Sequence, residues 1–105
     1  SNINYRRISL ASLYIQNGRK FIACNDDMFD IVKGRPLPTT GTILKTLEYI
    51  THQTPYVCGK PNPHIINVIS KEYGLGSEDK KRMIMIGDRI STDIGLANQA
   101  GIDSC

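Results

Sequence analysis

Apolar positions along the chain follow two patterns, helical spacing and short continuous runs. Helical spacing predicts four helices, and the short runs predict three strands between them. The expected helices cover residues 5–16, 42–51, 65–73 and 91–100. The expected strands cover residues 20–24, 56–58 and 83–86. Helices that alternate with short strands favour parallel pairing with helices packed on the sheet, which is an α/β fold.

The first two helices should each bury one apolar face. Gly18 is expected to end the first helix, because glycine readily adopts the left-handed conformation beyond a helix end. The residues expected in the core are Leu10, Leu13 and Tyr14 of the first helix and Ile43, Leu44, Leu47 and Ile50 of the second. We therefore interpret these apolar stripes as packing surfaces and not as a binding site.

The segment between residues 25 and 38 differs in composition from its surroundings. Its fourteen residues include five charged residues, two prolines and one glycine. Such a composition is typical of a loop that links two structural units. We predict a linker loop here.

Two carboxylates mark the most informative stretch of the chain. The apolar run at 83–86 ends abruptly at Gly87-Asp88, and Asp93 follows at the start of the next helix. Ligands of open α/β sheets bind outside the carboxyl ends of the strands, so both carboxylates could meet one hard cation such as Mg²⁺. Aspartate is also common in turns and in the first turn of helices, where its role is structural.

Lys60 lies in a second strand-to-helix turn. Pro61 and Pro63 suit the entry to a helix, where a missing N–H is no loss. An ammonium group at this place could hold a substrate phosphate, although a solvated loop lysine is the simpler reading. A nucleotide-binding P-loop is excluded, because Thr54 replaces its first glycine and Pro61 replaces its Ser/Thr.

Both turns together resemble known motifs. The pattern Gly-Asp-Arg-x-x-Thr-Asp-Ile at 87–94 resembles the fourth motif of haloacid-dehalogenase-type (HAD) phosphatases, and the segment around Gly-Lys-Pro at 59–61 resembles the third. The resemblance is to the class IIA subfamily of nitrophenylphosphatases, phosphoglycolate phosphatases and pyridoxal-phosphate phosphatases. It implies a partial Rossmann-like core, a parallel sheet between helix layers, with the tail end of an α/β cap domain.

The resemblance also implies roles and domain limits. It assigns residues 1–30 to the end of the cap, 31–38 to a linker and 39–105 to the catalytic core. It implies Mg²⁺ as the cofactor, held by Asp88 and Asp93. Lys60 and Asp93 would be catalytic, with Asp93 orienting either a metal-bound water or Lys60. Lys60, Asn25 and Asp27 would bind substrate, although Asn25 and Asp27 could simply form a turn.

One part of the family pattern is missing. These phosphatases act through an aspartyl-phosphate intermediate formed on a D-x-D motif, and no two aspartates of this chain lie two positions apart. No match to the second motif is recognisable either. We therefore expect the chain to be a fragment that is inactive alone, from an intact phosphatase. The alternative is a non-catalytic remnant that binds a partner or contributes to a dimer.

The composition of the chain limits the classes of molecule that we expect it to bind. The net charge is +3, and the one basic run, at 80–82, lacks interleaved aromatic residues, so we do not expect nucleic-acid binding. No apolar run is long enough to cross a membrane. Three cysteines without metal-type spacing suggest reduced thiols in the cytoplasm. The expected partners are a small-molecule phosphate ester and, through the cap, a second copy of the chain.

Overall fold

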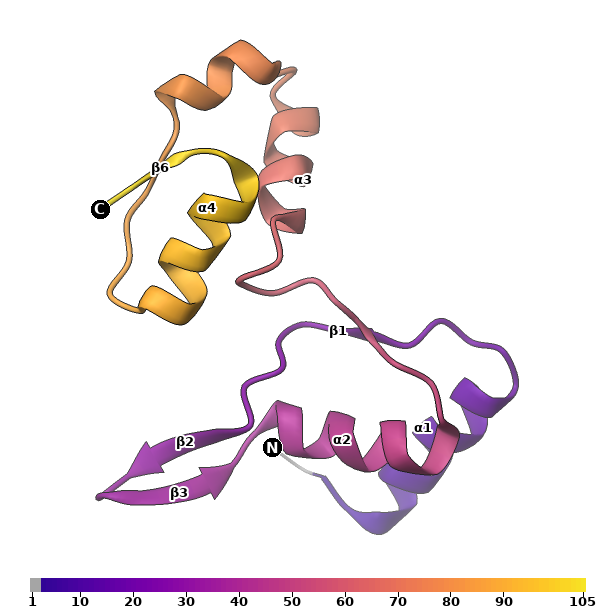
Figure 1. Ribbon diagram of the computed structural model, residues 1–105. Coiled ribbons are helices and arrows are strands. Elements are labelled where there is room, and N and C mark those ends of the chain that lie inside the picture. Colours follow the sequence, from indigo (N-terminus) through magenta and orange to yellow (C-terminus); the bar gives the residue numbers. More distant parts are fainter. Residues whose placement is uncertain (1–2) are drawn as a thin grey trace. The chain divides into compact units, whose positions relative to one another are not determined.

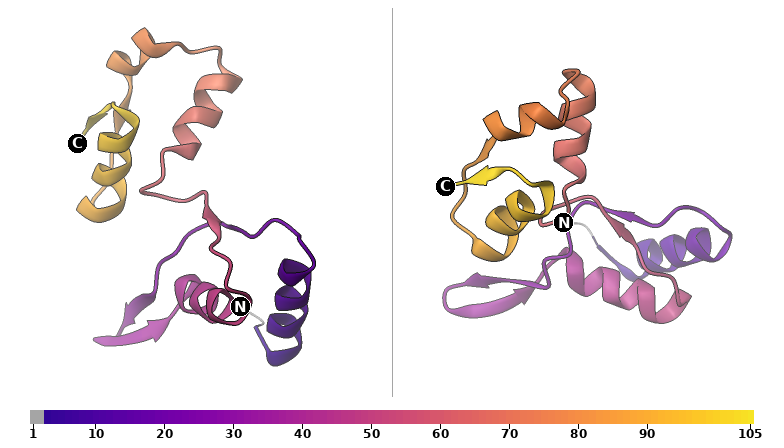
Figure 2. Two further views of the ribbon diagram at one scale, coloured as in Figure 1. Left: turned by 45° about the vertical axis from the view of Figure 1, so that its right-hand side comes forward. Right: turned by 45° about the horizontal axis from the view of Figure 1, so that its top comes forward.

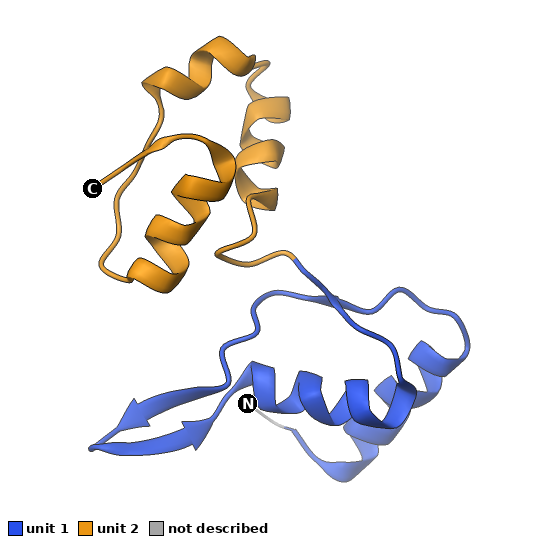
Figure 3. Cartoon of the chain, viewed as in Figure 1, with its two compact units in different colours: residues 1–57 blue, residues 58–105 orange. Residues whose placement is uncertain are grey.

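The chain forms two compact units that divide between Val57 and Cys58 (Figure 3). The computed structural model describes residues 3–105. Unit 1 ends at Val57, and unit 2 covers Cys58–Cys105. The cap, linker and core limits expected at residues 30 and 38 do not coincide with this division, and they stay a prediction.

Unit 1 holds two helices, a parallel strand pair and a hairpin (Figure 1). Its elements are α1 (Tyr5–Gln16), β1 (Ile22–Ala23), β2 (Phe29–Val32), β3 (Arg35–Pro38), α2 (Thr40–Thr51) and β4 (Tyr56–Val57). β1 and β4 are parallel, with Ile22 opposite Tyr56. The first helix has the predicted limits. It begins there because Asn4 Oδ1 accepts a hydrogen bond from the Arg7 N–H at 3.1 Å.

The core of unit 1 lies between α1 and α2, and it uses a different face of α1 from the one expected. Ser12 and Ile15 are buried, whereas the predicted core residues Leu10, Leu13 and Tyr14 are each about half exposed. At 100° per residue these three lie on the opposite side of the helix. The prediction was wrong because α1 carries apolar residues on both sides, so the spacing did not determine which side is buried.

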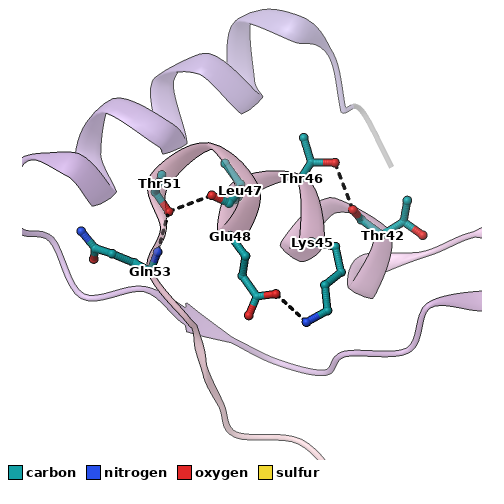
Figure 4. A network of polar contacts seen from close by, with 7 residues as sticks. All are labelled: Thr42, Lys45, Thr46, Leu47, Glu48, Thr51 and Gln53. Atoms are coloured by element: carbon teal, nitrogen blue, oxygen red, sulfur yellow. Dashed lines mark hydrogen bonds and ion pairs between the residues drawn. The ribbon is translucent and has the colours of Figure 1, made fainter.

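The second helix follows its prediction more closely. Leu44 and Leu47 are buried and Ile43 is partly buried, but Ile50 is 47% exposed. The polar groups of α2 bond locally, as Figure 4 shows. Thr51 Oγ1 donates to the Leu47 carbonyl at 2.7 Å, and Thr46 Oγ1 donates to the Thr42 carbonyl at 3.1 Å. The Lys45–Glu48 ion pair spans 2.5 Å on the same helix. These contacts belong to the helix itself and mark no separate site.

The expected linker loop contains a β-hairpin instead. β2 and β3 are antiparallel, with Val32 opposite Arg35 across a two-residue turn. Both turn residues have positive φ, 51° at Lys33 and 75° at Gly34, which is the geometry that a tight hairpin requires. In Figure 2 the hairpin extends away from the two helices of its unit.

Proline content made this segment read as a loop. Pro36 and Pro38 face Ile31 and Phe29, and counting from the turn these are the non-hydrogen-bonded pairs of the ladder. Proline is tolerated there because no N–H is needed at such positions on the edge of a sheet. The hairpin is therefore compatible with both prolines, which the composition alone did not reveal.

Unit 2 contains a helix-connected parallel strand pair. Its elements are α3 (His64–Glu72), the 3₁₀-helix η1 (Ser77–Arg82), β5 (Ile84–Met85), the π-helix η2 (Ile90–Ile94), α4 (Gly95–Ala100) and β6 (Asp103–Ser104). β5 pairs with β6 in parallel, and α4 connects them. The basic run at 80–82 lies in η1. The helix expected over 91–100 is divided, because its first turn is a π-turn.

Apolar side chains from helix and strand form the core of unit 2. Ile66, Leu96 and Ala100 are buried together, and Met83, Met85 and Ile102 pack against them. With a parallel strand pair in each unit, the fold is a partial α/β fold, as predicted. Within residues 3–105, no helix has the length and apolar content that crossing a membrane requires.

Candidate functional site

An ion pair between Lys60 and Asp93 lies at the centre of the candidate site in unit 2. Lys60 Nζ donates to Asp93 Oδ1 at 2.5 Å. The two residues come from different turns, the loop before α3 and the π-helix η2. The Lys60 side chain is about half exposed, whereas Asp93 is only 4% exposed. A buried carboxylate therefore holds the ammonium group of a side chain that is itself partly open to solvent.

The π-turn brings the Asp93 carboxylate back toward the end of β5. The N–H groups of Asp93 and Ile94 both donate to the Arg89 carbonyl, at 2.8 and 3.3 Å. Asp93 Oδ2 in turn accepts from the Arg89 N–H at 3.1 Å. One oxygen of Asp93 thus holds Lys60, and the other bonds the chain at Arg89. No sequence signal marks this role of Arg89, because it belongs to the backbone.

These contacts favour the ionised form of Asp93. The hydrogen bond from Lys60 is the main cause that lowers the pKa of the Asp93 carboxyl below its ordinary 3.8, and the Arg89 N–H contributes next. Burial of the carboxyl opposes the shift, but the direct bonds outweigh it. Asp93 is therefore a carboxylate at neutral pH, so its attraction for Lys60 persists there.

Acidification should remove a stabilising contribution of Asp93. Because its pKa is lowered in the folded state, the carboxylate stabilises the fold above pH 3.8, and this contribution is lost as the pH falls through the folded-state pKa. We expect the carboxyl-carbon NMR signal of Asp93 to titrate with a midpoint below 3.8. The variant Lys60→Met should raise that midpoint, because it removes the main cause. A midpoint at or above 3.8 in the unaltered chain would contradict the ion pair.

Asp88 differs from Asp93 in its surroundings. It lies three residues beyond the end of β5, it is exposed, and no hydrogen bond or ion pair within residues 3–105 reaches its carboxylate. Such a group suits one ligand of a hard cation. Residues 3–105 contain no cluster of three or more His, Cys, Asp or Glu side chains placed to bind a metal. Asp88 therefore fits Mg²⁺ as a single ligand, with further oxygen ligands required.

The metal role of Asp93 stays a prediction. Both of its oxygens already accept hydrogen bonds, from Lys60 and from the Arg89 N–H. This arrangement favours the second expected role, orienting Lys60, over direct coordination of the cation. Lys60 has three N–H donors, and Asp93 Oδ1 is the only acceptor that they reach among the described residues. Two donors are left for a ligand.

Asn25 and Asp27 lie in unit 1, where they belong to a turn. Asn25 Oδ1 accepts from the Asp27 N–H at 3.3 Å, and the Asp27 carbonyl accepts from the Gly41 N–H at 2.7 Å and from Thr39 Oγ1. The turn is thereby tied to the first turn of α2. Their neighbour Asp26 borders a cavity of about 270 Å³ in the same unit, which Asn25 and Asp27 do not line. Substrate contact by these two residues stays a prediction.

Comparison with known proteins adds a family match. Residues 57–105, nearly the same stretch as unit 2, match the family model described as HAD-hydrolase-like. The chain is 36% identical over 103 residues to an acid sugar phosphatase of Staphylococcus epidermidis. That alignment covers 97% of this chain and 38% of the phosphatase.

Solved structures agree with the sequence match. A 4-nitrophenylphosphatase from Thermotoga maritima superposes with a TM-score of 0.84 at 36% identity, covering 99% of this chain and 39% of that protein. A glycerol phosphate phosphatase from Mycobacterium tuberculosis, in complex with magnesium, superposes with a TM-score of 0.82 at 28% identity, covering 98% and 30%. The chain thus spans well under half the length of the relatives it matches.

Proposed function

The chain belongs to the haloacid-dehalogenase-like hydrolases, of the nitrophenylphosphatase type, and we propose that the protein containing it is a Mg²⁺-dependent phosphatase of small-molecule phosphate esters. The observation that carries the proposal is the Lys60–Asp93 ion pair, which presents a fixed ammonium group in the same unit as Asp88, whose carboxylate has no partner within residues 3–105. A cation-binding carboxylate and a phosphate-binding ammonium are the charges that phosphoryl transfer requires.

Lys60 binds the phosphate group in this proposal. Its ammonium is a compact charge with donors to spare, and Asp93 restricts its position. A lysine held in place loses little conformational freedom when it binds an anion, so more of the attraction is available for binding. Asp93 acts through Lys60 and is a positioning residue in this scheme.

Asp88 supplies a metal ligand. Asp88 lies in the turn that follows β5, beyond the carboxyl end of a parallel strand, where ligands of α/β folds bind. Bound Mg²⁺ would neutralise charge on the phosphoryl oxygens. Support for this cation comes from the hard oxygen donor of Asp88 and from the magnesium bound to the M. tuberculosis relative.

The attacking nucleophile is proposed to lie outside residues 1–105. The family forms an aspartyl-phosphate on a D-x-D motif, which these residues do not contain. The relatives are more than twice as long as the alignment, so they have ample sequence for such a motif. The three cysteines are free thiols in the structure, which supports a reducing, cytoplasmic location for the protein.

Metal removal tests the proposal. We expect the full-length protein that carries these residues to hydrolyse 4-nitrophenyl phosphate, to lose at least about 100-fold of its turnover in excess EDTA, and to recover with added Mg²⁺. The measurement is release of nitrophenolate. Hydrolysis that continues unchanged in EDTA would rule out the metal, and no hydrolysis with any phosphate ester would favour the non-catalytic alternative. The isolated 105-residue chain serves as a control and should be inactive.

A further inference from the structure

Gly87 lies at the point where β5 has ended and the Asp93 side chain crosses the backbone. A Cβ atom built on Gly87 would lie 2.3 Å from Asp93 Cγ, 2.4 Å from its Cβ and 2.5 Å from its Oδ2. Real Cβ atoms essentially never approach other heavy atoms within 3.0 Å. The carboxylate thus occupies the space that any side chain at position 87 would need.

Backbone conformation does not explain the glycine. The glycines with left-handed φ are Gly18, Gly34, Gly74 and Gly101, and Gly87 is not among them. An alanine could therefore adopt the backbone conformation at position 87, and the three heavy atoms nearest to its Cβ would all belong to the Asp93 side chain. The requirement is steric, and Asp93 supplies the nearest obstructing atoms.

The neighbour cannot move away without losing its contacts. Asp93 is buried, its Oδ1 holds Lys60 and its Oδ2 accepts from the Arg89 N–H. These bonds fix both oxygens, and a Cβ at position 87 would displace the group that carries them. Displacing Asp93 would release Lys60 from the place where the structure holds it.

We propose that Gly87 is a positioning residue of the phosphatase site, because its missing side chain lets the Asp93 carboxylate lie across the end of β5 and hold Lys60. The catalytic part of this inference rests on the proposed function, whereas the steric part does not. Gly87 touches no substrate in this scheme. It acts through Asp93, and Asp93 acts through Lys60.

A double-mutant cycle tests the steric part. Gly87→Ala should clearly lower the urea midpoint of the 105-residue chain, whereas in an Asp93→Gly background the same change should lower it little, because the obstructing atoms are gone. Gly76→Ala is the control, since a Cβ there meets only Asp79 Oδ2, at 3.9 Å. If Gly87→Ala has equal effects in both backgrounds, or none in either, the proposal is overturned. Gly87→Ala alone could fail to fold. In that case the proposal is still supported if the double variant Gly87→Ala/Asp93→Gly folds and has the same urea midpoint as the single variant Asp93→Gly.

Turnover of the full-length protein tests the positioning part. Gly87→Ala should lower kcat for 4-nitrophenyl phosphate by about 100-fold, the order of loss for a misplaced site group. It should also change kcat and KM in the same proportion as Asp93→Asn, which breaks the ion pair while keeping the side-chain shape. A variant that folds normally and keeps full turnover would overturn the positioning role. Absence of activity in the unaltered protein would contradict the proposed function and leave the result of the stability cycle standing.

Discussion

Asp88→Asn is expected to reduce Mg²⁺-dependent hydrolysis by the full-length protein by about a thousandfold, the upper range for loss of one electrostatic group in an active site. An amide keeps the size of the side chain but loses the negative charge that a hard cation prefers. Because Asp88 is exposed and reaches no partner within residues 3–105, the change should leave stability nearly untouched. Turnover and thermal unfolding are to be measured on the same preparation.

The matched control is Glu78→Gln. Glu78 is an exposed carboxylate of unit 2 that pairs with Lys81 at 2.9 Å, so its amide variant removes the same charge elsewhere. Its turnover should stay within about twofold of the unaltered protein, because an exposed ion pair contributes little. Unchanged turnover in Asp88→Asn, or an equal loss in both variants, would reject Asp88 as the metal ligand.

Lys60→Met is the second change with a large expected effect. It keeps the length of the side chain and removes the ammonium that we propose binds the phosphate, so turnover should fall by about 10²- to 10³-fold and KM should rise. It also leaves the buried Asp93 carboxylate without its main partner, which should raise the pKa of Asp93. Kinetics of 4-nitrophenyl phosphate hydrolysis provide the measurement.

Lys81→Met is the control for this variant. Lys81 forms an ion pair of the same type in the same unit, but both partners are exposed on η1. Loss of the Lys81 ammonium should leave kcat and KM nearly unchanged. Equal effects of Lys60→Met and Lys81→Met would mean that net charge, and not the position of Lys60, determines turnover. That result would contradict the phosphate-binding role.

Local patterns were sufficient for most of the elements. The first helix has its predicted limits because the cap at Asn4 and the turn at Gly18 lie next to the helix they delimit. The predicted strand before Gly87 also agrees with β5. In each case the determining residues lie within a few positions of the element, so the sequence contains the whole signal.

Predictions that depend on contacts with another segment of the chain were less accurate. The buried side of α1 was assigned wrongly, because α2 determines which of two apolar sides is covered. The hairpin at β2 and β3 was read as a loop, because its prolines are tolerated only through the register of the opposing strand. Both errors concern contacts between segments, which neither composition nor periodicity encodes.

The sequence by itself indicated the family through two motifs, most of the helices and strands other than the hairpin β2–β3, and the chemical groups at the candidate site. Lys60, Asp88 and Asp93 stand out because each lies in a recognisable motif between a strand and the helix that follows it, or at the start of that helix. Only the tertiary structure decided which of them are in contact. Lys60 and Asp93 are 33 positions apart, and a π-turn together with the missing side chain of Gly87 brings them into contact. The physical reason is that the sequence at one position states which chemical group is present there. The orientation of that group depends on atoms that the fold brings to it from elsewhere in the chain.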